Sequence, residues 1–203
     1  IVVMGMGEPL ANLDNLLKSL DFATSPQGLG ISARNITIST VGLPGRIKQL
    51  AATGKPYHLA VSLHAPNNEL RQQIVPTAEK IDLNEIMGAA DFFREKTGRQ
   101  VTFEYVLLGG INDLPEHASQ LVRLLAQRDA MINLIPYNPV SGLPYQTPAP
   151  QRSKGFADTL RRAGYTVKIR KRKGSSINAA CGQLRLVHEE IVPLNPSLPG
   201  EKT

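Results

Sequence analysis

The stretch HLAVSLH, residues 58–64, carries the pattern that decides the fold. Its apolar run predicts a buried strand, and the polar residues Ser62 and His64 come where that strand ends. Similar runs predict further strands at 1–7, 35–40, 101–108, 131–138 and, less regularly, 165–171. Helical periodicity falls between them at 12–23, 82–98, 113–129 and 151–164. This alternation predicts parallel βα units, and the nearly continuous apolar runs predict strands covered on both faces.

Polar groups at the strand ends favour one of two architectures. They are Gly7, Glu8, Ser39, Thr40, Ser62, His64 and Asn138. In a βα barrel these ends converge on one mouth, where active sites form. In an open doubly wound sheet they spread along an edge, with one crevice at the switch point. Polar groups on strand after strand favour the barrel.

Composition bounds the class of protein. The chain has 203 residues, 41% hydrophobic and 20% charged, which is typical of a globular protein. No apolar run reaches the roughly 18 residues of a membrane span, so no membrane association is expected. The single cysteine cannot form an internal disulfide, which indicates the reducing cytoplasm.

Positive charge is concentrated near the C-terminus. The net charge is +6, and no acidic residue lies between Asp158 and Glu189. That interval includes KIRKRK (168–173), which contains Lys168, Arg170, Lys171, Arg172 and Lys173. A field of one sign suits a polyanion such as nucleic acid. The alternative is a solvated strand and helix face.

Three strand-end motifs are candidates for ligand binding. In GMGEP (5–9), the glycines allow close backbone approach and Glu8 can accept hydrogen bonds, although a plain turn is the alternative. Ser62 and His64, two residues apart, are expected on one side of the pleat, with His64 as a ligand donor, a general base or a structural residue. Asn138 either reads a planar ligand or forms an Asn-Pro turn. Four histidines without paired spacing argue against a zinc site.

Cys181 lies in INAACGQL (177–184), among small residues and close to the basic run. A buried, inert cysteine is the default interpretation. Neighbouring cations would instead favour a thiolate, and so a nucleophile. No nearby residue clearly completes a Cys-His pair, so a protease or hydrolase has no positive support.

Six motifs in this order resemble the RlmN/Cfr family of radical-SAM methyltransferases, which act on C2 or C8 of an adenine in ribosomal RNA. They are GMGEPLAN (5–12), ITISTVGLP (36–44), LAVSLHAPN (59–67), VTFEYVLLGGIND (101–113), NLIPYNP (133–139) and INAACGQL (177–184). The resemblance covers roughly residues 1–185. The C2-methylating branch, which also modifies tRNA, is the more similar one.

The resemblance implies an α/β fold, a partial (βα)6 barrel, which we place over residues 1–188. The prolines of the last segment predict a disordered tail at 189–203. The resemblance further implies that S-adenosylmethionine (SAM) contacts Gly7, Glu8, Ser39, Ser62, Leu63, His64 and Asn138, with Glu8 on the amine. Cys181 is then the methyl carrier, and the basic run binds 23S rRNA and tRNA. An electron donor such as flavodoxin or ferredoxin and a monomeric full-length protein are also implied.

The resemblance also implies parts that this sequence lacks. The family holds a 4Fe–4S cluster with three cysteines after its first barrel strand, and it has a resolving cysteine and a small N-terminal domain. We expect these upstream of Ile1, so that the chain lacks the first strand and the cluster loop and is inactive alone. The alternatives are a non-catalytic RNA-binding or SAM-binding remnant, or a radical-SAM enzyme with a non-RNA substrate.

Overall fold

The computed structural model describes residues 1–5, 7–75, 81–140 and 142–170. Cys181, the basic residues Lys171, Arg172 and Lys173, and the tail 189–203 lie outside these described residues. Among the described residues, no helix is long and apolar enough to cross a membrane.

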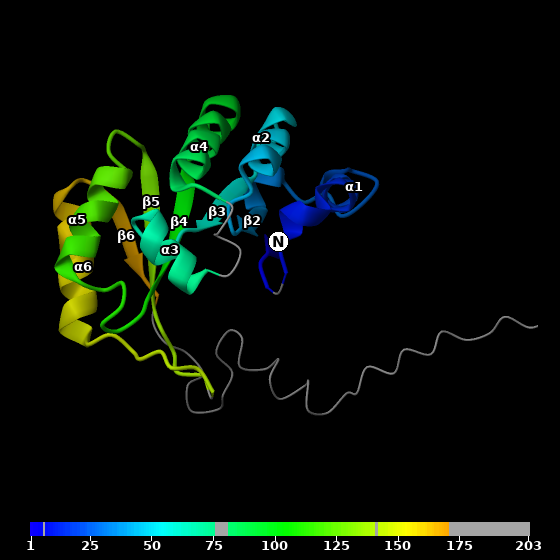
Figure 1. Cartoon of the computed structure of the whole chain (residues 1–203). Helices are drawn as coiled ribbons and strands as arrows, with labels where there is room; N and C mark the ends of the chain where they lie inside the picture. Colours follow the sequence, from blue (N-terminus) through cyan, green and yellow to red (C-terminus); the bar gives the residue numbers. More distant parts are fainter. Residues whose placement is uncertain (6, 76–80, 141, 171–203) are drawn as a thin grey trace, which may run out of the picture.

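The described residues form one parallel sheet with helices between successive strands (Figure 1). The strands are β1 (Val2–Val3), β2 (Thr37–Thr40), β3 (His58–Ser62), β4 (Val101–Leu107), β5 (Ala130–Pro136) and β6 (Thr166–Ile169). The helices are α1 (Leu13–Thr24), α2 (Pro44–Ala52), α3 (Asn68–Ile74), α4 (Leu83–Thr97), α5 (Pro115–Leu124) and α6 (Pro150–Arg162), with short 3-10 turns η1 (Pro9–Asn12) and η2 (Ala33–Asn35).

The order of the strands settles the architecture. The sheet runs β1-β2-β3-β4-β5-β6, so each strand pairs in parallel with its neighbours in sequence. A doubly wound sheet reverses its strand order at a switch point, whereas a barrel winds in one direction. Figure 1 shows α1 beside one end of this sheet and α5 and α6 beside the other. The fold is therefore the predicted partial barrel, with β1 and β6 as the two edges of the described sheet.

The six predicted strands and four predicted helices are all present, with shifted ends. Helix α4 begins where Asp82 caps the backbone N–H of Asn84 at 2.7 Å, and it ends at Gly98 with φ +66°. Helix α5 stops at Leu124, earlier than the periodicity to residue 129 predicts. Helices α2 and α3 were not predicted, because their segments are short.

The two faces of β4 and β5 differ, which corrects the prediction that both are covered in these strands, whereas β3 has three consecutive buried residues, as predicted. In β4 the buried residues Val101, Phe103, Tyr105 and Leu107 alternate with half-buried ones, and β5 shows the same alternation. The buried side faces the helices, as the Tyr105 ring lies 5.2 Å from the Phe156 ring of α6. The other, inner face is only half buried, because the described strands do not close on themselves.

Candidate functional site

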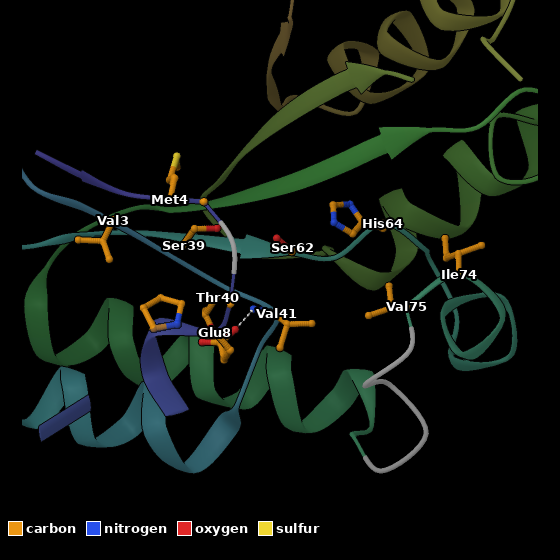
Figure 2. Close-up of a pocket in the computed structure, with 13 residues that line it drawn as sticks. Val3, Met4, Glu8, Ser39, Thr40, Val41, Ser62, His64, Ile74 and Val75 are labelled. Atoms are coloured by element: carbon orange, nitrogen blue, oxygen red, sulfur yellow. Dashed lines mark hydrogen bonds between the residues drawn. The ribbon is translucent and has the colours of Figure 1, made fainter. Parts of the chain in front are cut away.

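A cavity of about 460 Å³ lies at the carboxyl ends of β1, β2 and β3. Its polar wall includes Glu8, Ser39, Thr40, Ser62 and His64, which Figure 2 shows around one space. Apolar side chains complete the lining, namely Val3, Met4, Pro9, Val41, Ile74 and Val75, together with Gly5 and Gly7. Mostly apolar clefts of this size with a few convergent polar groups are typical ligand sites.

Five of the seven residues predicted to contact SAM meet in this cavity, namely Gly7, Glu8, Ser39, Ser62 and His64. The side chain of Leu63 is fully buried in the core instead. Its backbone N–H donates to the Glu104 carbonyl of the neighbouring strand at 3.0 Å. Asn138 follows β5 and is not part of the lining. Its side-chain oxygen is buried and has no partner among the described residues.

Glu8 joins the loop after β1 to the end of β2. One carboxylate oxygen accepts the N–H of Leu10 at 3.0 Å and so caps η1, while the other accepts the N–H of Val41 at 2.6 Å. Figure 2 shows this second bond across the cavity wall. Gly7 precedes it with φ +92°, a conformation that favours glycine. Each carboxylate oxygen keeps a second lone pair, so Glu8 can still accept from an amine.

His64 does not follow the strand pleat, contrary to the prediction from its spacing to Ser62. Strand β3 ends at Ser62, and His64 has a left-handed φ of +60°. Burial, and then the positive charge of Arg71, lower the pKa of His64 from 6.5 to about 4. The imidazole is therefore neutral near pH 7 and a poor general base. Of the two functional roles predicted for His64, hydrogen-bond donor to a ligand and general base, the donor role is the one that fits.

Two buried polar residues of the site were not singled out from the sequence. Arg71 of α3 is fully buried and donates to the backbone carbonyls of Val41 at 2.6 Å and Leu63 at 3.2 Å. Asn112 is fully buried as well, and it donates to the carbonyls of His64 at 2.8 Å and Val106 at 2.7 Å. The sequence offered only an arginine in a segment that was not predicted to be a helix and the asparagine of GGIND (109–113).

The inner face carries a polar row that leads from the cavity to the edge strand β6. The sheet register places Ser62 beside Glu104, Glu104 beside Asn133, and Asn133 beside Lys168. Asn133 donates to Glu104 at 2.9 Å. Burial raises the pKa of Glu104, while this hydrogen bond and the charge of Arg170 act in the opposite direction. The exposed Lys168 thus lies on the edge strand, and the exposed Arg170 directly follows it.

The described residues offer no ligand set for an iron–sulfur cluster. Among them, no group of three or more His, Cys, Asp or Glu side chains is placed to hold a metal. The whole sequence has only one cysteine, whereas such clusters are held by several thiolates. The residues present therefore fit a SAM-sized organic ligand but not a cluster.

Comparisons with known proteins agree with this geometry. The chain is 59% identical to the probable dual-specificity RNA methyltransferase RlmN of Rhodopirellula baltica, over 94% of this chain and 52% of that protein. It is 46% identical to the protein of the same name from Caldicellulosiruptor saccharolyticus, over 94% of this chain and 56% of that protein. This chain is a relative of the RlmN proteins. It spans about half the length of the curated RlmN relatives it matches.

Solved structures share the fold of this chain. A radical SAM methyltransferase from Sphaerobacter thermophilus superposes with a TM-score of 0.86 at 41% identity, over 90% of this chain and 54% of that one. A domain of a pyruvate-formate lyase-activating enzyme from Bacteroides vulgatus has a TM-score of 0.64 at 19% identity, which shows the fold alone. No family model matches the chain.

Proposed function

We propose that this chain supplies the SAM-binding and RNA-facing part of a radical-SAM methyltransferase that methylates C2 of an adenine in 23S rRNA and tRNA. The observation that carries the proposal is the 59% identity to a probable RlmN over 94% of the chain. The cavity supports it as well, because five residues for which the resemblance implies SAM contacts come from separate motifs and meet there.

The chemistry of the cavity suits SAM. The donors and acceptors of Glu8, Ser39, Ser62 and His64 face the same space as the apolar side chains of Ile74 and Val75. SAM combines polar amino-acid and ribose groups with a flat adenine, so it needs both kinds of surface. We infer that Glu8 accepts from the amine, as the resemblance implies, while the serines and His64 hold the remaining polar groups. Asn138 lies outside this cavity, so its contact with SAM stays a prediction from the resemblance.

We infer that Cys181 is the methyl carrier. SAM, when bound, supplies the methyl group that the Cys181 thiolate accepts. The cations of residues 168–173 favour the thiolate over the thiol, since a positive field lowers a thiol pKa. The same cations suit the phosphates of RNA. The target adenine must be unpaired or splayed out, since the reacting edge of a stacked base is hidden.

A chain without cluster ligands lacks one part of this chemistry. We therefore expect the 203 residues alone to transfer no methyl group to RNA. Methylated adenine formed by the isolated chain in the presence of SAM and a reductant would contradict this expectation.

A Cys181→Ala substitution in the gene that encodes this chain tests the proposed function. The readout is 2-methyladenosine in digests of purified 23S rRNA and tRNA, measured by mass spectrometry. We expect the modified nucleoside to disappear, while the matched control Lys18→Ala, an exposed lysine of α1, keeps it. Unchanged 2-methyladenosine in the Cys181→Ala strain refutes the proposal, and 8-methyladenosine in its place in the unmutated strain refutes the C2 assignment.

A further inference from the structure

His64 has a backbone conformation that needs support. Its φ of +60° is rare for a residue with a side chain and costs on the order of 1–3 kcal/mol. The conformation is held from both sides, because the His64 N–H donates to the Glu104 carbonyl at 3.3 Å and the His64 carbonyl accepts from Asn112 at 2.8 Å. Strained residues of this kind are retained where their position matters.

The ring of His64 has a defined tautomer. The backbone N–H of Val106 donates to Nδ1 at 3.2 Å, so Nδ1 carries no proton. In a neutral imidazole the proton is then on Nε2. No hydrogen bond joins Nε2 to another residue within the described part of the chain, and His64 lines the cavity. The ring therefore keeps one free donor at the ligand site.

Burial is the main reason that the His64 ring is neutral, and Arg71 adds to this effect while holding the strand ends in place. Its guanidinium donates to the carbonyls of Val41 and Leu63, which lie at the ends of β2 and β3. No ion pair links Arg71 to an acidic residue among those described. A buried cation without a counter-ion opposes a second positive charge nearby, and Glu8 on the other wall is already bonded to two backbone N–H groups.

We propose that His64 is a fixed, neutral Nε2–H donor to an acceptor atom of the bound cofactor, and that Arg71 and Asn112 are positioning residues that hold it in this state. The identity of the cofactor rests on the proposed function, whereas the state of the ring does not. The acceptor is an oxygen or ring nitrogen of SAM. The site excludes an imidazolium, so His64 takes no part in proton transfer.

Nitrogen NMR on the chain labelled with 15N-histidine tests the state of the ring without any ligand. The His64 signals are assigned by their loss in His64→Gln. We expect the Nε2–H tautomer from pH 6 to 8, with protonation beginning only below about pH 5. An Nδ1–H tautomer, or a titration near pH 6.5, overturns the proposal. In Arg71→Met the titration moves toward 6.5, and Arg71→Lys keeps it low.

A matched pair of variants tests the donor. Gln places its amide nitrogen near Nε2 of the histidine it replaces, and Asn places its polar atoms near Nδ1. Circular dichroism confirms that both variants fold, and calorimetry measures SAM affinity. We expect His64→Asn to weaken SAM binding at least tenfold more than His64→Gln. Equal losses overturn the donor role. If the unmutated chain binds no SAM although the NMR tautomer is as expected, the proposed function fails and the state of His64 stands.

Discussion

The side chain of Asn112 closes the gap between the ends of β3 and β4, and its removal has a calculable effect. Its amide donates to the carbonyls of His64 and Val106, and its oxygen accepts the N–H of Leu108 at 2.7 Å. Asn112→Ala leaves three backbone groups without these bonds in a buried place. Since each of the three bonds contributes about 1–1.5 kcal/mol net, the expected loss in free energy of unfolding is roughly 3–4.5 kcal/mol.

Urea denaturation followed by circular dichroism measures this loss. With a denaturant slope of about 2 kcal/mol per molar, the midpoint of unfolding falls by roughly 1.5–2.3 M. The control is Asn15→Ala on α1, whose exposed amide bonds only to Asn12 at 2.8 Å. That variant is expected to change the free energy of unfolding by less than about 0.5 kcal/mol.

The reasoning is refuted if Asn112→Ala and Asn15→Ala have the same midpoint, because the bonds of Asn112 would then contribute nothing. The SAM affinity of Asn112→Ala provides a second test, because Asn112 holds the strained residue His64. Loss of Asn112 releases the His64 carbonyl, so SAM affinity is expected to fall even in solutions where the variant is fully folded.

Three further outcomes are expected. His64 takes up a proton near pH 6.5 in the unfolded chain but only near pH 4 in the folded one, so the free energy of unfolding falls by about 3 kcal/mol as the pH drops through this window. When the free energy of unfolding is measured against pH, His64→Gln is expected to lack this fall. In filter binding, Lys168→Ala and Arg170→Ala are each expected to lower the slope of log RNA affinity against log salt concentration by about one, while Lys18→Ala leaves it unchanged. If all three variants keep the slope of the unmutated chain, Lys168 and Arg170 do not contact RNA. Phe156→Ala, which empties the space beside the Tyr105 ring, is expected to cost about 3–5 kcal/mol in thermal unfolding, and a loss below 1 kcal/mol would contradict that packing.

Strands and long helices could be predicted because their signals are local. The apolar run of residues 101–108 and the leucines of residues 12–23 each define an element without reference to the rest of the chain. Short helices such as α3 escaped, since seven residues hold too few turns to show a period. The half-buried inner face also escaped, because an apolar run does not reveal which side of a strand meets helices.

The candidate site was predictable where its residues lie in motifs directly after strands, as Glu8, Ser39 and Ser62 do. Arg71 and Asn112 were not, because their roles come from backbone carbonyls 6 to 48 positions away in sequence. A side chain that satisfies a distant carbonyl has no local pattern to mark it.

Residue types and spacing alone thus determine that this chain is a series of βα units with polar strand ends and a basic C-terminal run. Folding decides the rest. Parallel pairing in sequence order brings the ends of β1, β2 and β3 to one cavity, and burial beside the Arg71 cation makes His64 a neutral donor instead of a base. The physical reason is that strand order, burial and the field of a buried charge depend on distances in space, which neighbours in sequence do not set.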